Sequence, residues 1–431
     1  MPTDQVNDKV VRVLGSLYAA GHFQDRFQAP SSLQDALKYE FPKDQRGAAM
    51  ELLTTDTRSQ GEKVARQTII NGAVLLKNEG GTLPIAKGAA KIALLGKCAE
   101  GTTKDKSSRL LMHTKLTSLQ DALNEAVDGQ GTQVASSGDA AEAKGASVAV
   151  VCAMAFAADG WDRDNLTLPD VDWLIAGARK NGAEKVVVLA IAPGAVTTEW
   201  IADADAALLL FAPGGELGPA VADLLVGGAS PGGRLPVTLP EADESRFGAS
   251  QYPGECAGQQ KWCENMTANF SEGTLVGYRW NDAMVVKAAF PFGFGLDYTE
   301  FSYDNFRVDC SSDAAAVKVT VTNVGGRQGT AVPQAYVGFD KLRPAVRQLR
   351  GFRKVVLPAG GTAEVTFVLR EEDWRFYDAS AGEWRSAVQE GDFVTVHVGS
   401  SSADLLWSET LSCDFVALKD NSGLLRPLVM G

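Results

Sequence analysis

The segment of this sequence best suited to chemistry is residues 158–169, ADGWDRDNLTLP, which is rich in carboxylates. It follows the apolar run at 148–154, and continuous apolar runs of this kind are typical of strands buried in a parallel sheet. Loops at the carboxyl ends of such strands are where α/β proteins place reactive groups. A carboxylate in this loop could act as a general acid or base, and nothing else in the chain offers an obvious carboxylate partner for it.

Position alone does not single out one carboxylate of this loop. Four acidic residues fall between positions 159 and 170, and at least three of them must be solvated loop residues or helix caps. Asp170 follows Pro169, and we expect it to lie at a helix N-terminus, where the helix dipole stabilises a negative charge. From the residues alone, catalysis and an ordinary structural role both stay open for each of the four.

The chain lacks the residue patterns of the common alternative sites. It contains three histidines, His22, His113 and His397, and no GxSxG sequence, which argues against a Ser–His hydrolase. No cysteines or histidines have metal-ligand spacing, so we expect no metal site. The segment at 213–218 precedes a predicted helix but lacks GxGxxG spacing, which disfavours a phosphate cradle. We therefore expect no cofactor.

Composition narrows the class of partner. The chain has 431 residues, of which 45% are hydrophobic and 22% charged, and this is ordinary for a globular protein with two or three domains. Its net charge of −12 argues against nucleic acid and against anionic membrane surfaces, both of which need a basic face. No apolar run approaches the roughly 18 residues of a membrane span. A neutral, soluble substrate is therefore expected.

The cysteines favour an oxidising compartment. Cys256 and Cys263 bracket a short polar loop, and Cys310 and Cys413 flank the last domain, so we expect each pair to form a disulfide. The first residues of the chain lack the basic and apolar regions of a signal peptide. Because the cysteine pairs indicate disulfides, we expect the full-length protein to be secreted, or held in another oxidising compartment, although these first residues are not a signal peptide.

Two further features bear on the compartment without deciding it. Cys98 and Cys152 lie on or beside predicted buried strands, and we expect them to be core thiols. N-glycosylation sequons begin at Asn165, Asn265 and Asn269, a number close to what chance gives in a chain of this length.

Hydrophobic periodicity divides the chain into segments. Residues 1–45 contain one predicted helix, at 6–20, that has no sheet of its own. In residues 46–245, short apolar runs at 92–95, 148–152, 186–190 and 206–211 alternate with predicted helices. This alternation predicts an α/β layer: a mostly parallel sheet with helices on both faces.

The rest of the chain has a different period. Residues 246–300 form a connector whose aromatic residues need burial, which indicates that it is ordered. Residues 301–420 contain strictly alternating runs at 317–322, 363–369 and 393–398, and these predict a β-sandwich. Residues 421–431 are a tail.

Several segments, which follow one another along the chain as in the family, resemble glycoside hydrolase family 3, the family of β-glucosidases and β-xylosidases. AVLLKNEGGTLP at 73–84 resembles the entry to the family's second domain. FAPGGE at 211–216 and PGGRLPVTLP at 231–240 resemble its "PGxEGG" and "PSGRLPVTxP" sequences, and FPFGFGLDYT at 290–299 resembles "FPFGxGLSYT". Residues 323–352 resemble its fibronectin type III-like domain.

This resemblance implies an architecture and an activity. In the family, a TIM barrel carries the nucleophilic aspartate, the α/β domain lends the acid/base, and a fibronectin type III-like β-sandwich follows. Residues 11–23 resemble the last helix of the barrel, so the barrel itself is expected to be missing from this chain. The chain would then be the C-terminal portion of a retaining β-glycosidase, inactive alone, which acts on β-glucosides or β-xylosides together with a barrel in the same or another chain.

The resemblance also assigns roles to the acidic loop. The family's acid/base is usually a glutamate in a sequence like "SEGxDR", and Asp159 stands at its position, so Asp159 is the candidate general acid/base. Trp161, Asp162 and Arg163 are then candidate substrate-binding residues. Two departures favour an alternative, a non-catalytic carbohydrate-binding or interaction module: aspartate is one methylene shorter than glutamate, and residues 104–113 lack the glycines of the family's "GGGS" loop.

Overall fold

The computed structural model describes residues 58–96, 117–157, 163–242, 255–256, 266–267, 270–311, 314–339, 347–378, 380–387 and 393–411. The chain divides into two compact units, Met1–Lys63 and Val64–Gly431, and almost all of the described residues belong to the second. The predicted helix at 6–20 lies outside the described residues.

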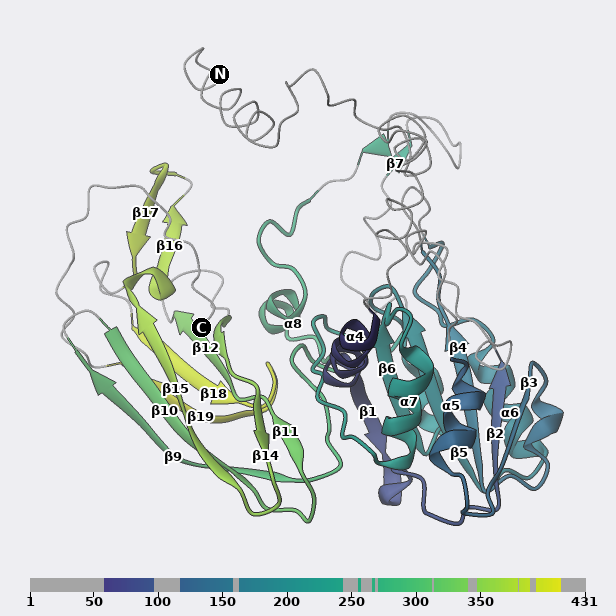
Figure 1. Ribbon diagram of the computed structural model, residues 1–431. Helices are drawn as coiled ribbons and strands as arrows, with labels where there is room; N and C mark the ends of the chain where they lie inside the picture. The colour runs from purple at the N-terminus through teal and green to yellow at the C-terminus, as the bar shows by residue number, and fades with distance from the viewer. Residues whose placement is uncertain are drawn as a thin grey trace, which may run out of the picture. The chain divides into compact units, whose positions relative to one another are not determined.

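A six-stranded sheet with the strand order β1-β6-β5-β4-β2-β3 forms the centre of the first domain (Figure 1). All neighbours in it are parallel except β1, which runs antiparallel to β6. The strands are β1 (Val74–Asn78), β2 (Lys91–Gly96), β3 (Gln133–Ser137), β4 (Val148–Met154), β5 (Lys185–Ala192) and β6 (Ala206–Phe211). The predicted mostly parallel sheet is therefore confirmed.

Helices cover both faces of this sheet, which is why its central strands are apolar throughout. Three helices, α4 (Arg58–Gly72), α5 (Leu119–Ala126) and α7 (Leu217–Val226), pack on one face. The helix α6 (Val171–Lys180) packs on the other face with the 3-10 helices η3 (Ala140–Ala143) and η4 (Glu199–Asp203). Each face has its own buried core, and at 25 cal/mol per Å² such burial is the main stabilising contribution of the domain.

Local signals fix the ends of these helices. Ser118 precedes α5, and its hydroxyl accepts a hydrogen bond from the Asp121 backbone N–H at 3.0 Å. Gly227 ends α7 with φ 78°, a left-handed conformation that glycine adopts without strain. Gly218, in the segment considered above as a phosphate cradle, faces the backbone of Thr117 and Ser118 so closely that a Cβ would not fit. This glycine therefore serves the packing of α7 against the start of α5.

The connector is ordered in the part that the structure describes, and it includes the helix α8 (Tyr278–Met284). Phe290 and Leu239 exchange backbone hydrogen bonds, and the Leu296 N–H donates to the Leu75 carbonyl of β1. Phe290 and Phe294 are partly buried against the core on the α6 face. These two aromatic residues of the connector thus pack on the α/β domain, whereas the Tyr278 ring lies edge-on to the Tyr336 ring of the last domain.

The last domain contains a three-stranded sheet, β15-β10-β9, and a four-stranded sheet, β13-β12-β18-β19, with the smaller pairs β11-β14 and β16-β17. Its strands are β9 (Phe301–Cys310), β10 (Ala314–Asn323), β11 (Gly329–Ala331), β12 (Gln334–Phe339), β13 (Gln348–Phe352), β14 (Val355–Leu357), β15 (Thr362–Arg370), β16 (Arg375–Asp378), β17 (Glu383–Ser386), β18 (Val394–Gly399) and β19 (Leu405–Thr410). Alternate residues of β10 and β15 are buried in one core with those of β18. The predicted β-sandwich is confirmed.

Partly buried polar contacts join the α/β domain to the sandwich at Thr330 on β11. The Arg234 guanidinium, which is partly buried, donates to the Thr330 carbonyl at 3.0 Å. The Asp297 carboxylate accepts from the Thr330 N–H at 2.8 Å and from the Thr299 N–H at 3.2 Å. Burial raises the pKa of Asp297 and lowers the pKa of Arg234, so both groups are held where their charged forms are costly.

Further contacts surround this joint. Lys354 Nζ donates to the Asn71 carbonyl at the end of α4 at 2.6 Å, and burial, together with the charge of Arg234, lowers the pKa of Lys354 to about 8. The Tyr298 hydroxyl donates to the Leu224 carbonyl at 2.8 Å. The Arg327 guanidinium lies 5.8 Å from the centroid of the Tyr298 ring, a cation–π distance. The joint is therefore polar but hydrogen-bonded.

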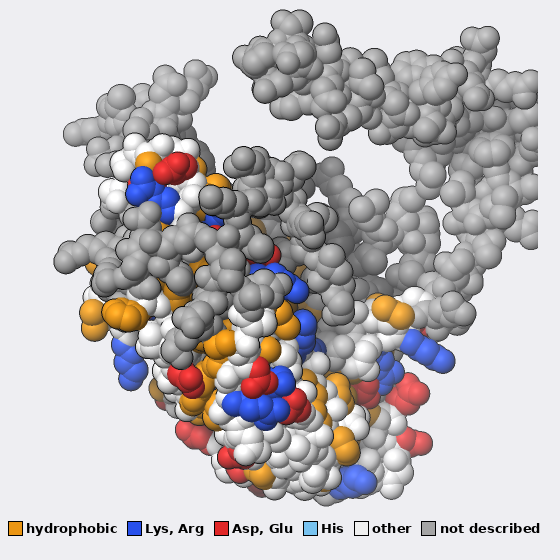
Figure 2. Space-filling view, turned by 90° about the vertical axis from the view of Figure 1, so that its left-hand side faces the viewer, with side chains coloured by type: hydrophobic (Ala, Val, Ile, Leu, Met, Phe, Trp, Pro, Cys, Tyr) orange, Lys and Arg blue, Asp and Glu red, His pale blue; other side chains and the backbone are white. Residues whose placement is uncertain are grey.

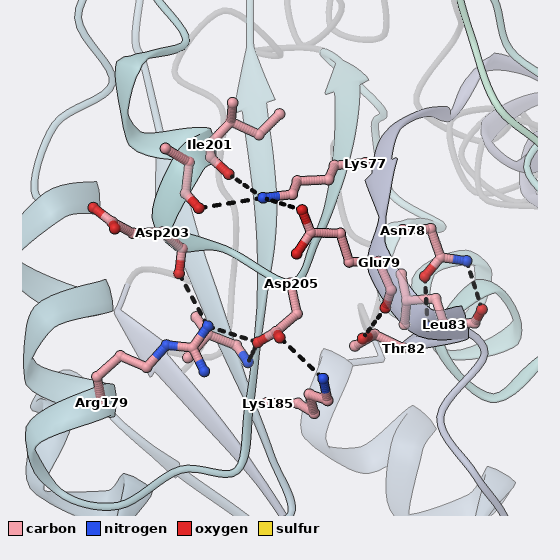
Figure 3. Close-up of polar contacts among 12 residues, drawn as sticks. Lys77, Asn78, Glu79, Thr82, Leu83, Arg179, Lys185, Ile201, Asp203 and Asp205 are labelled. Atoms are coloured by element: carbon pink, nitrogen blue, oxygen red, sulfur yellow. Dashed lines mark hydrogen bonds and ion pairs between the residues drawn. The ribbon is translucent and has the colours of Figure 1, made fainter.

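Charged residues form hydrogen bonds between elements at the edge of the sheet where the parallel strands begin (Figure 3). Lys77 Nζ, on β1, donates to the carbonyls of Ile201 and Ala202 in η4, at 3.0 and 3.2 Å. Asp205 accepts from Arg179 at 2.7 Å and from Lys185 at 3.1 Å. Burial alone would raise the pKa of Asp205, but the hydrogen bonds from the Val186 N–H, Lys185 and Arg179 outweigh it and lower that pKa. This network is structural and leaves the opposite edge for the candidate site.

The surface seen in Figure 2 has no field of one charge sign among its described residues. Blue and red side chains are interspersed there, with small apolar patches between them. Within the described ranges, no helix combines the length and apolar character needed to cross a membrane.

Candidate functional site

The topology of the sheet places a switch point between β2 and β4. These two strands are neighbours, and their carboxyl ends are Gly96 and Met154. The chain after β2 continues into α5 on one face, whereas the chain after β4 continues into α6 on the other. Ligands of open α/β sheets bind outside the carboxyl ends of the strands at such a point. The acidic loop that follows β4 therefore begins at the place where this architecture puts ligands.

The end of β2 is packed tightly against β4. Gly96 has φ 82°, and a Cβ on it would lie 2.8 Å from the Cys152 carbonyl oxygen and 2.7 Å from a methyl group of Leu174. Glycine is required here for both reasons: the left-handed backbone and the lack of space. The two strands that flank the switch point are thus held at a fixed separation.

The structure describes part of the predicted site. Asp159, Trp161 and Asp162 lie outside the described residues, as do residues 104–113, so their predicted roles stay predictions. Arg163 is described and half-buried. Its guanidinium donates from Nη1 to the Ala195 carbonyl oxygen at 2.9 Å, and burial lowers its pKa. The Arg163 side chain therefore bonds to the protein backbone, whereas the sequence had suggested only a role in substrate binding.

A second contact ties the same loop to the segment after β5. The Leu166 carbonyl accepts a hydrogen bond from the Thr197 N–H at 2.9 Å, and Leu168 is 4% exposed. Together with the Arg163–Ala195 bond, this fastens residues 163–168 to residues 193–198 at two points. The chain immediately after the candidate acid/base is thus anchored at the carboxyl edge of the sheet.

The segment that receives this loop is itself fixed in the core. Thr198 is buried, and its hydroxyl donates to the Pro240 carbonyl at 3.0 Å. Trp200 is also buried, and its indole N–H donates to the Thr197 carbonyl at 2.8 Å. A side chain positioned from this base has a rigid support, which precise placement of a catalytic group requires.

Two other acidic residues of the loop are described. Asp164 is exposed. Asp170 lies at the N-cap of α6, as expected, with φ 62° and no hydrogen bond from a helical N–H to its side chain. Its carboxylate can stabilise the helix by its charge alone.

The cysteines differ in part from expectation. Cys152, predicted to be a core thiol, is disulfide-bonded, so that prediction was wrong. Burial alone cannot distinguish a free thiol from half of a disulfide, because both are apolar and both are found inside proteins. Cys310 is disulfide-bonded, as predicted. The pairings Cys310–Cys413 and Cys256–Cys263 stay predictions.

In the described part of the chain, no group of three or more histidine, cysteine, aspartate and glutamate side chains is placed to hold a metal ion. His397, on β18, has Nδ1 2.6 Å from the Ser408 hydroxyl on the neighbouring strand β19.

Two known protein families match this chain, one for each of its two domains. Residues 73–298 match the sequence model of the glycosyl hydrolase family 3 C-terminal domain, and residues 331–402 match that of the fibronectin type III-like domain. The first match covers more than half of the chain, and the two matches fall on the α/β domain with its connector and on the sandwich.

Relatives and solved structures agree with these matches. The chain is 29% identical to thermostable beta-glucosidase B of Acetivibrio thermocellus over 374 residues, covering 81% of this chain and 48% of that protein. Among solved structures, the beta-D-glucoside glucohydrolase of Trichoderma reesei has a TM-score of 0.70 at 26% identity, covering 82% of this chain and 55% of the other. A family 3 beta-glucosidase of Bifidobacterium adolescentis has a TM-score of 0.72 at 28% identity, with 94% and 64% covered. The chain spans about half the length of the curated relatives it matches.

Proposed function

Because this chain belongs to glycosyl hydrolase family 3, we propose that it is the C-terminal portion of a retaining β-glycosidase and supplies the acid/base side of the site. The observation that carries the proposal is the acidic loop at the carboxyl end of β4, anchored beside the switch point of the sheet. Beta-glucosidases among the relatives and solved structures support a β-glucoside as the substrate. β-Xylosides are the second substrate class within the same proposal.

The chemistry explains why this portion would need a partner domain. A retaining glycosidase uses two carboxyl groups about 5–5.5 Å apart, one as the nucleophile and one as the acid that later becomes the base. We assign the second role to Asp159 and expect the nucleophile on a TIM barrel, in the same chain or in another. Substrate would then bind between the barrel and the acidic loop, with water excluded from the covalent intermediate until the base activates one molecule.

The test is hydrolysis of p-nitrophenyl β-glucoside and β-xyloside by residues 1–431 alone and by a protein that also contains a family 3 barrel. We expect no hydrolysis above background by the chain alone, since half of a carboxylate pair provides no covalent route, and turnover when the barrel is present. Hydrolysis by the chain alone would contradict the proposal. Sugar binding without turnover, in a barrel-containing protein, would instead favour the non-catalytic carbohydrate-binding module.

The Arg163–Ala195 hydrogen bond gives a second prediction. In the barrel-containing protein, Arg163→Ala is expected to lower kcat by about 10²-fold with a smaller change in KM, because a shift of about 1 Å in the acid/base loop can cost this much. Arg163→Lys should retain part of the activity, since its ammonium can still donate to the Ala195 carbonyl. A rise in KM with kcat unchanged would instead assign Arg163 to substrate binding.

A further inference from the structure

We propose that Asn165 is an N-glycosylation acceptor, so that the loop following β4 carries a covalent glycan. Asn165, Leu166 and Thr167 form a sequon whose middle residue is not proline. The number of sequons is uninformative, but the structure describes the surroundings of the one at Asn165. Asn265 and Asn269 lie outside the described residues, and the proposal concerns Asn165 alone.

The geometry of this sequon leaves the reacting atom free. The Asn165 Oδ1 atom accepts hydrogen bonds from the Thr167 hydroxyl at 2.6 Å and from the Thr167 backbone N–H at 3.0 Å. Both bonds use the carbonyl end of the amide, and no hydrogen bond links its Nδ2 atom to another described residue. Asn165 and Thr167 are both exposed. A glycan attached to Nδ2 would therefore displace no contact of the described structure.

The residues around the sequon explain how the fold tolerates a bulky modification at this position. Leu166 and Leu168 hold the loop against the domain. The Leu166 carbonyl accepts a hydrogen bond from the Thr197 N–H, and the Leu168 side chain is buried. The neighbouring residues Asp164, Asn165 and Thr167 are exposed. The anchoring contacts and the acceptor thus lie on different sides of the same short segment, and glycosylation would leave the anchoring intact.

The disulfides provide an independent observation about compartment. Cys152 lies in the α/β domain and Cys310 in the sandwich, and both are disulfide-bonded. Disulfides persist in the secretory pathway and outside the cell, and are rare in the cytosol. In a eukaryotic cell, a chain that acquires disulfides in two domains would pass through the endoplasmic reticulum, where sequons are glycosylated.

The reaction needs a lipid-linked oligosaccharide as co-substrate. A bond forms between Asn165 Nδ2 and C1 of the first N-acetylglucosamine, and the bond from C1 to the pyrophosphate oxygen breaks. The lipid pyrophosphate leaves with the electron pair, and Nδ2 loses one proton. No oxidant or reductant is required.

The test uses the protein purified from its source. Trypsin cleavage after Arg163 and Arg179 gives the peptide 164–179, in which Asn165 is the only sequon. Peptide N-glycosidase F in heavy-oxygen water should convert Asn165 to an aspartate that carries the heavy isotope, and mass spectrometry reads this shift. Recovery of the peptide only in its unmodified form, before and after the enzyme, would overturn the proposal.

Matched variants secreted from a eukaryotic host separate the acceptor from its surroundings. Asn165→Gln and Thr167→Ala should each lose one glycan on a denaturing gel, whereas Thr167→Ser should keep it, since serine also completes the sequon. An unchanged glycan count in both of the first two variants would also contradict the proposal. Circular dichroism of Asn165→Gln checks that the variant is folded.

Discussion

Asp159→Ala, in a protein that includes the barrel, is expected to reduce turnover of alkyl β-glucosides by about 10²- to 10⁴-fold, the usual contribution of a general acid. Dinitrophenyl β-glucoside should be affected far less in its first chemical step, because its leaving group departs without protonation. The measurement is kcat/KM, which reports the steps up to formation of the covalent intermediate, for a series of glycosides whose leaving groups differ in pKa. We expect the logarithm of the rate to depend steeply on leaving-group pKa in the variant and weakly in the parent.

Two further variants make this result specific to Asp159. Asp162→Ala is the matched control, since it removes a carboxylate three positions away in the same loop and should not produce the leaving-group dependence. Asp159→Glu adds the methylene that the family's usual residue has, and its activity reports whether the loop is adjusted to the shorter side chain. An equal fall for activated and unactivated substrates in Asp159→Ala, or no fall for either, would exclude Asp159 as the acid.

Asp297→Ala is expected to destabilise the protein by about 1–3 kcal/mol, the usual cost of leaving inward-facing hydrogen-bonding groups without their partner. The change would leave the N–H groups of Thr330 and Thr299 without their acceptor. It would also remove the negative charge that offsets the partly buried Arg234 guanidinium. Because Thr330 is held through its N–H by Asp297 and through its carbonyl by Arg234, the loss falls on the joint between the two domains.

Urea unfolding of residues 1–431, followed by circular dichroism and by tryptophan fluorescence, measures this effect. Asp304→Ala is the matched control, because Asp304 is an exposed aspartate on β9, and its replacement should change stability by less than about 0.5 kcal/mol. Adding Arg234→Met to Asp297→Ala should recover part of the loss, since the double variant no longer buries an unpaired charge. Equal stability of the Asp297→Ala and Asp304→Ala variants would refute the assignment of the joint.

Local patterns determined the classes of the two domains. The runs at 148–152 and 186–190 are apolar at every position, and they form strands covered on both faces, because burial of both faces removes any need for polar alternation. Val317, Val319 and Val321 alternate with polar residues and bury one face of β10, as a sandwich requires. The same periodicity located the acidic loop at the end of β4. Each of these inferences depends on residues close together in sequence.

Other features were decided by contacts between distant residues. The strand β3, of sequence QVASS, carries no apolar run and is a strand because it pairs in parallel with β2 at the edge of the sheet. The antiparallel direction of β1 also follows from pairing, in this case with β6.

The sequence alone thus indicated the apolar central strands, the classes of the two domains and the family that the chain resembles, and it predicted where a reactive carboxylate would lie. The tertiary structure decided how that loop is held, through Arg163 on Ala195 and Leu166 on Thr197, and that Cys152 is part of a disulfide. It also decided that Asp297 and Arg234 meet at Thr330. The physical reason is that periodicity reports only whether a residue is buried, whereas the partner of a buried polar group is chosen by the packing of elements far apart in the chain.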